Sequence, residues 1–139
     1  MNNPRRILHF LLYFTTFFLF ILHPVHAEEK MVTAVKFDYD IIAGLWQRTD
    51  GGYLIKINDV QGDGQAKVEY FNPRPIHVAE STISTKKELI KLFVEFQDKG
   101  YEGSTYTLFY YAEKDALAGF YYQAAMDRTY EVIFLRKSD

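Results

Sequence analysis

The chain has 139 residues, with 16 lysines and arginines against 18 aspartates and glutamates, and it contains no cysteine. This balance gives no strong basic patch, so nucleic acid is not a predicted partner. The absence of cysteine excludes both disulfides and a lipid attached to cysteine, so the fold must be held by its core alone. The length suits one domain and is short for two.

The first 27 residues have the pattern of a secretory signal peptide. Arg5 and Arg6 precede an apolar run from Ile7 to Leu22, and Val25 and Ala27 are the small residues of a cleavage site. As a helix, this run would span about 24 Å, less than the roughly 30 Å of a hydrocarbon core. We therefore expect export, to the periplasm or out of the cell, after cleavage near Ala27. An uncleaved N-terminal anchor is the alternative.

Residues 28–42 form an N-terminal segment before the predicted domain. A short helical turn at 37–42, with Asp38 or Asp40 as its cap, is one expectation. Because His77 is the one histidine after residue 27, a site with several histidine ligands is excluded, and no metal is predicted.

Apolar and polar residues alternate through residues 43–139, which is typical of half-buried strands. The pattern is clearest at 89–97, where Ile90, Leu92 and Val94 share one face. Eight strands are predicted, at residues 43–49, 53–60, 65–72, 76–83, 89–97, 104–111, 116–124 and 129–136. Because short turns join successive strands, we predict an all-β domain that forms an eight-stranded antiparallel up-and-down barrel. A two-sheet β-sandwich is the alternative.

A membrane-spanning barrel is not expected. The predicted strands are mostly shorter than the roughly 9–11 residues that such barrels need, and charged residues such as Lys56 and Glu69 interrupt their outward faces.

The stretch from Phe37-Asp38 to Gly44-Leu45-Trp46 resembles the start of a lipocalin barrel, where Gly-x-Trp opens the first strand. Leu117-x-Gly119-x-Tyr121 is similar to late-strand patterns of avidin-type barrels. The resemblance implies a small calycin-type barrel with a general binding role. The asparagine and serine that hold biotin in avidins are absent, so biotin is not expected.

The same resemblance implies structural roles for Gly44, Trp46 and Arg136. In lipocalins the tryptophan packs at the closed end beneath an arginine from near the end of the chain. A meander brings the start of its first strand and the end of its last strand to one end of the barrel, which permits a stack of Arg136 on Trp46. Such a cation–π contact contributes about 1–2 kcal/mol when partly desolvated.

The opposite end of the barrel collects the connections at 50–52, 72–75, 98–103 and 125–128, and we place function there. Arg74 is the strongest candidate, because Pro73 and Pro75 restrain its backbone and its guanidinium suits a carboxylate or phosphate. The predicted ligand-binding residues are Arg48, Tyr53, Arg74, Tyr101, Tyr106, Tyr121 and Arg128.

Strand parity also assigns faces to other aromatic residues. Tyr70, Tyr110 and Tyr130 are expected to point inward, where an eight-stranded interior is either filled or holds one small ligand. An apolar stripe that could contact a partner is expected on the outer face, at Thr105, Thr107, Phe109, Tyr111, Phe120 and Tyr122.

No catalytic residues and no cofactor are predicted. His77 faces away from the core by parity, and Asp98 and Glu102 are loop acids without a further catalytic group beside them. We therefore predict a non-enzymatic, exported barrel that binds a small, partly apolar or anionic ligand at its open end. The alternative is a non-catalytic interaction module of the cell envelope, an inhibitor or accessory protein that binds an envelope protein, and a filled interior would favour it.

Overall fold

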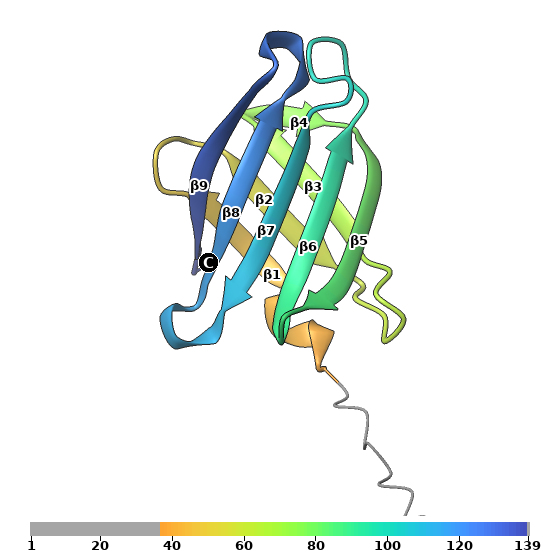
Figure 1. Ribbon diagram of the computed structural model, residues 1–139, viewed down its shortest axis with the longest axis vertical. Coiled ribbons are helices and arrows are strands. Elements are labelled where there is room, and N and C mark those ends of the chain that lie inside the picture. Colours follow the sequence, from red (N-terminus) through yellow and green to blue (C-terminus); the bar gives the residue numbers. More distant parts are fainter. Residues whose placement is uncertain (1–36, 139) are drawn as a thin grey trace, which may run out of the picture. The chain divides into compact units, whose positions relative to one another are not determined.

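The computed structural model describes residues 37–138, which form one antiparallel sheet that curls into a nearly closed barrel (Figure 1). The predicted signal peptide, residues 1–27, lies outside the described residues. The strands are β1 (Gly44–Arg48), β2 (Leu54–Asn58), β3 (Lys67–Asn72), β4 (Arg74–Ile76), β5 (Val78–Lys86), β6 (Leu89–Phe96), β7 (Thr105–Tyr111), β8 (Ala116–Gln123) and β9 (Arg128–Arg136).

The strands follow one another as a meander, in the order β4-β3-β2-β1-β9-β8-β7-β6-β5. The first strand of the chain, β1, pairs with the last, β9, and Trp46 is the partner of Arg136 in this pairing. The predicted all-β, up-and-down architecture is therefore confirmed, as a single sheet and not as a two-sheet sandwich.

The described sheet has nine strands and not eight, because the predicted strand at 76–83 is divided at His77. β4 folds back on β3 around Pro73, so that Arg74 pairs with Asn72. The backbone N–H of His77 then donates to the Asp98 carboxylate at 3.0 Å and leaves the ladder. A proline such as Pro75 is tolerated in a short edge strand because such a strand does not need every N–H.

The structure also corrects the expected turn at 84–88. β5 continues to Lys86, and the turn to β6 consists of Lys87 and Glu88, whose φ angles are 50° and 65°. Two positive φ angles define a type I′ hairpin turn, which is usually marked by asparagine and glycine. Neither asparagine nor glycine occupies either position, so local sequence does not predict the shorter turn.

The barrel closes between β3 and β5 at the end of the β2–β3 connection. Gln65 forms an isolated antiparallel bridge with Thr82, and the N–H of Ile83 donates to the carbonyl of Gly64 at 2.8 Å. Gly64 has a φ of 91°, a conformation that glycine adopts without a steric penalty. This seam brings the end of the β2–β3 connection against β5 and nearly closes the ring of strands.

The interior of the barrel is filled by large side chains. The largest with almost no exposure are Trp46, Tyr70, Tyr106, Phe96 and Phe134. Burying each such apolar side chain stabilises the fold by about 1.5–3 kcal/mol. The packed core therefore makes a rigid base for the loops at either end.

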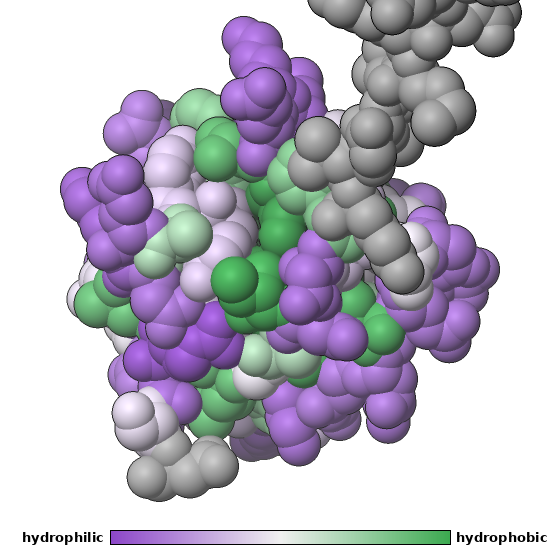
Figure 2. All heavy atoms as spheres, turned by 90° about the horizontal axis from the view of Figure 1, so that it is seen from below, coloured by the Kyte–Doolittle hydropathy of each residue, from purple (hydrophilic) through white to green (hydrophobic). Residues whose placement is uncertain are grey.

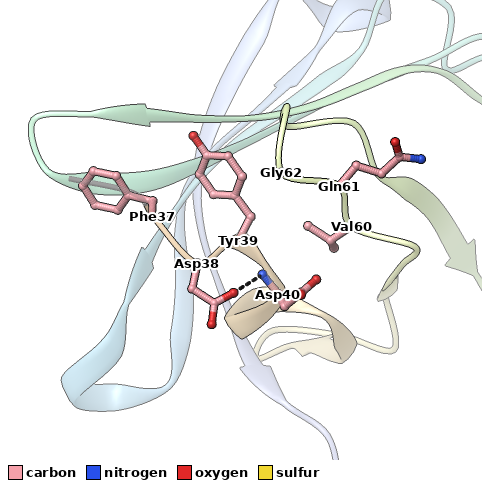
Figure 3. A pocket seen from close by; sticks show the side chains of 7 residues that line it. All are labelled: Phe37, Asp38, Tyr39, Asp40, Val60, Gln61 and Gly62. Atoms are coloured by element: carbon pink, nitrogen blue, oxygen red, sulfur yellow. Dashed lines mark hydrogen bonds between the residues drawn. The ribbon is translucent and has the colours of Figure 1, made fainter. Parts of the chain in front are cut away.

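A short 3₁₀ helix, η1 (Tyr39–Ile42), covers the closed end, and the Asp38 side chain caps it by accepting from the N–H of Asp40 at 3.1 Å. Beside η1 lies a hollow that also borders Val60 and the start of the β2–β3 connection (Figure 3). Viewed from this end, hydrophobic residues gather near the middle of the surface with hydrophilic residues around them (Figure 2). Within residues 37–138, no helix is long and apolar enough to cross a membrane.

Candidate functional site

Arg136 organises the closed end of the barrel. Its guanidinium lies 4.2 Å from the ring centroid of the fully buried Trp46. It also donates to the carbonyls of Ala43 at 2.6 Å and Ile41 at 2.7 Å, and pairs with Asp115 at 2.7 Å. Arg136 thus ties the end of η1 and the β7–β8 turn to the barrel.

Gly44 and Tyr110 complete this structural cluster. Gly44 has a φ of 129°, and a Cβ added there would lie 3.0 Å from Nη1 of Arg136. Tyr110 packs edge-on against Trp46 with ring centroids 6.1 Å apart, and its hydroxyl donates to Asp115 at 3.0 Å. The contacts satisfy the polar groups of the cluster internally, so we assign it to stability.

The ion pair of Asp115 predicts a dependence of stability on acid. The hydrogen bonds from Arg136 hold the pKa of the Asp115 carboxyl below its ordinary value, although burial acts in the opposite direction. A carboxyl with a lowered pKa in the folded state stabilises the fold above its unfolded pKa of about 3.9, and this contribution is lost as the pH falls through the folded pKa. Asp115→Asn should therefore lower the thermal midpoint at pH 7 and flatten its fall below about pH 4.

Asp127 provides the matched control for Asp115. Both residues end a 3₁₀ turn in the left-handed conformation, and Asp127 accepts from the Tyr122 hydroxyl at 3.0 Å. Among the described residues, Asp127 has this tyrosine contact but no ion pair with an arginine, so Asp127→Asn should lower the thermal midpoint at pH 7 by less than Asp115→Asn does. Equal slopes for Asp115→Asn and the wild type would contradict the assignment.

At the opposite, open end the structure forms a bowl of about 670 Å³. Its lining comes from the ends of β1, β3, β8 and β9 and from the β6–β7 connection. The β6–β7 and β8–β9 connections stand side by side at the top of the barrel in Figure 1. The bowl lies above the packed interior and is open to solvent.

A chain of polar contacts builds the floor of the bowl around Arg48. Nη1 of Arg48 donates to the Tyr106 hydroxyl at 3.0 Å, which in turn lies 3.3 Å from the Tyr70 hydroxyl. The guanidinium stacks 3.7 Å from the ring centroid of Tyr53 and forms an ion pair with Asp50. Three partners, Tyr106 on β7 and Asp50 and Tyr53 in the β1–β2 connection, therefore fix the orientation of this arginine.

The floor keeps its charge over the physiological pH range. Burial raises the pKa of Tyr70 and of Tyr106, so both hydroxyls stay protonated. Burial acts to lower the pKa of Arg48, but its contacts with Asp50 and Tyr106 outweigh this effect, so the pKa lies above its ordinary value. The positive charge of Arg48 is thus permanent, and Asp50 compensates it.

Aromatic rings contribute to the wall at Tyr53, Tyr101, Tyr121 and Tyr130. Nδ2 of Asn72 donates to the Tyr101 hydroxyl at 2.7 Å. Tyr121 and Tyr130 stack with ring centroids 6.4 Å apart and ring planes 23° from parallel. Within residues 37–138, every buried side-chain nitrogen or oxygen has a hydrogen-bond partner. The unpaired polar atoms of the bowl therefore face solvent, where a ligand can reach them.

The structure brings together part of the predicted ligand-binding set. Arg48, Tyr53, Tyr101 and Tyr121 line the bowl, and the buried Tyr106 lies directly beneath it.

Arg74 and Arg128 do not belong to the lining of the bowl. Arg74 is exposed on the short strand β4, and Arg128 is exposed at the first position of β9. Of the three arginines on which the predicted anionic character of the ligand rested, two therefore lie outside the lining and only Arg48 belongs to it.

Sequence reasoning missed several lining residues, namely Asp50, Asn72, Gln123, Thr129 and Glu131. Strand parity places Asn72 on the inward face two residues after Tyr70, and this signal was available. The others depend on how the β1–β2 and β8–β9 connections bend over the rim, which alternation does not predict.

The two loop acids have separate hydrogen-bond partners. The Asp98 carboxylate accepts from the backbone N–H of His77 at 3.0 Å and lies 2.7 Å from its ring nitrogen Nδ1. These two hydrogen bonds lower the pKa of Asp98. Glu102 accepts from the backbone N–H of Gly100 at 2.8 Å. His77 itself is largely exposed, as parity predicted. Among the described residues, no three histidines or acids converge to hold a metal ion.

The predicted apolar stripe lies on the outer face of the sheet. Tyr111 is 43% exposed and Phe120 is 47% exposed. β9 extends this face with Ile133 and Leu135, each 48% exposed. Phe109, Ala118 and Ile133 stand in one cross-strand row. The outer face of β7–β9 thus carries exposed hydrophobic side chains.

Comparison of the chain with protein-family models, with curated proteins and with solved structures finds no match.

Proposed function

We propose that this protein is an exported, lipocalin-like barrel without catalytic activity that binds one small molecule in the bowl at its open end. The observation that carries the proposal is a bowl of about 670 Å³ set on a packed barrel. That volume falls within the roughly 300–1,000 Å³ typical of small-molecule sites. Export would rest on residues 1–27.

The fixed floor supports binding because it lowers the entropic cost of association. Arg48 is only 11% exposed and is held by Asp50 and the Tyr106 hydroxyl before any ligand arrives. Groups that are already ordered lose little conformational freedom when they contact a ligand. The site is therefore preorganised.

The charges of the bowl favour an uncharged ligand over an anionic one. Asp50 neutralises Arg48, and Glu131 adds a further carboxylate to the lining. A carboxylate or phosphate would meet this negative charge without an uncompensated cation to bind it. Of the two predicted ligand classes, the partly apolar one has the better support.

The alternative function, an interaction module, is favoured by two other observations. The interior is filled, and Tyr111, Phe120 and Ile133 expose hydrophobic surface on the outer face. Exposed patches of this kind often mark contacts between proteins. The two functions use different faces of the barrel, which allows one experiment to separate them.

Tyr130→Ala should weaken the binding of any small molecule in the bowl by tenfold or more, which is about 1.4 kcal/mol. Tyr130 is 40% exposed at the rim, so its loss should leave the fold intact. The measurement is a titration of ¹⁵N-labelled protein with a chemically diverse fragment library. The backbone signals of Gly100 and Thr129 report on the bowl, and that of Phe120 reports on the outer face.

Tyr111→Ala is the matched control, because Tyr111 is exposed to a similar extent, 43%, on the outer face. It should leave binding in the bowl unchanged. Fragments that shift only the signals of the outer face, with sensitivity to Tyr111→Ala and not to Tyr130→Ala, would favour the interaction module.

A further inference from the structure

The wall of the bowl is unsuited to a purely apolar ligand. Among the described residues that line it, none has an aliphatic side chain. Its apolar surface comes from tyrosine rings, whose hydroxyls remain polar. A fatty or hydrocarbon ligand would cover polar groups without giving them hydrogen bonds, at a cost of about 1–3 kcal/mol for each group left unpaired.

Planar polar side chains stand among these rings. Asn72 and Gln123 carry amides, Asp50 and Glu131 carry carboxylates, and Arg48 carries a guanidinium. An amide both donates and accepts, a carboxylate accepts at two oxygens, and a guanidinium donates in a fork. Arg48, Asp50 and Asn72 already hold hydrogen-bond partners within the protein. Neighbouring hydroxyls of one ligand can bind to both ends of the Gln123 amide or of the Glu131 carboxylate.

The two kinds of surface occur together in one bowl and match a single ligand chemistry. A pyranose ring has faces of C–H groups, which pack on aromatic rings, and a rim of hydroxyls that each donate and accept. The rings of Tyr101, Tyr121 and Tyr130 would take the C–H faces, while the Gln123 amide and the Glu131 carboxylate would bind the hydroxyls. The paired charges of Arg48 and Asp50 neither require nor favour a charged sugar.

We infer that the bowl binds an uncharged saccharide, either a mono- or disaccharide or the end of a longer glycan. This inference rests on the proposed function of the open end and names its ligand class. The bowl is wide and open, so binding of a short sugar is expected to be weak, with a dissociation constant of about 1 mM. Higher affinity would come from a longer glycan that also crosses the rim.

The test titrates ¹⁵N-labelled protein, produced from its full chain, with cellobiose, maltose, lactose and N,N′-diacetylchitobiose. Glucuronate, dodecanoate and adenosine serve as probes of the anionic, aliphatic and aromatic classes. At least one neutral disaccharide should shift the signals of Gly100 and Thr129 in a saturable manner. Gln123→Ala should weaken that binding by about tenfold, or 1.4 kcal/mol.

Gln97→Ala is the matched control for Gln123→Ala, because Gln97 is exposed and lies outside the lining of the bowl. It should bind the disaccharide as the wild type does. If glucuronate, dodecanoate or adenosine shifts the bowl and no neutral saccharide does, the saccharide assignment is overturned while the binding function stands. If no probe of any class shifts the bowl at tens of millimolar, both are overturned.

Discussion

Trp46→Ala is expected to lower the free energy of unfolding by about 3–5 kcal/mol, the range for truncating a large buried aromatic residue. The side chain is fully buried at the closed end. Its Nε1–H donates to the carbonyl of Ile42 at 2.9 Å, and Arg136 covers its ring at 4.2 Å. The substitution would therefore leave a cavity, an unpaired carbonyl and a partly buried arginine without its stacking partner.

Urea denaturation of the wild type and the variant measures this loss. Since a domain of this size has a total stability of about 5–15 kcal/mol, the variant should unfold at a much lower denaturant concentration. Phe120→Ala is the control, because it removes an aromatic ring that is 47% exposed, and it should change stability by less than about 1 kcal/mol. Equal losses in the two variants would show that Trp46 does not close the barrel.

Trp46→Phe separates packing from hydrogen bonding. Phenylalanine keeps a ring beneath Arg136 but removes the donor to Ile42. We expect it to retain more than half of the stability that Trp46→Ala loses, because most of the effect comes from the filled volume.

The barrel could be predicted because alternation has a period of two and each connection is short. Once the strands form a meander, parity assigns Tyr70, Tyr106 and Tyr110 to the interior, and each of them is buried there. The same topology brings Trp46 to Arg136, although 90 positions of sequence separate them. These predictions depend on strand order and parity, which local sequence patterns largely determine.

The division of the fourth predicted strand into β4 and β5 could not be predicted from alternation and strand order. Alternation continues across His77, and what ends the ladder there is a hydrogen bond from its backbone to Asp98, 21 residues away. The type I′ turn at Lys87 and Glu88 likewise lacks the usual glycine or asparagine. In both places tertiary contacts outweigh the local preferences.

Strand parity predicted part of the candidate site but not the pairing of its charges. Arg48 and Tyr106 lie 58 residues apart, and parity alone predicts that both face inward at the open end. Parity does not show that Arg48 is neutralised by Asp50, which sits in the turn after β1. The anionic ligand was therefore a natural expectation from three arginines, and the observed charge pairing is what weakens it.

Gly64→Ala is expected to open the seam of the barrel between β3 and β5. A Cβ at this position would lie 2.1 Å from the carbonyl oxygen of Ile83, which is backbone and cannot turn aside. The φ of 91° adds strain for any residue with a Cβ. We expect a loss of about 2–4 kcal/mol, since overpacking costs about 1–3 kcal/mol and the backbone conformation about 1 kcal/mol more.

Gly62→Ala provides a close control, because both glycines belong to the β2–β3 connection and a Cβ at Gly62 would meet nothing within 4 Å. Urea denaturation should show little change for Gly62→Ala and a large loss for Gly64→Ala. Hydrogen exchange gives a local measurement, because the N–H of Ile83 donates across the seam to Gly64 at 2.8 Å. In Gly64→Ala this amide should exchange faster than the amides of β7 and β8, whose ladders are intact. If the Ile83 amide keeps its wild-type protection, β3 and β5 are not joined at this point and the barrel closes by other contacts.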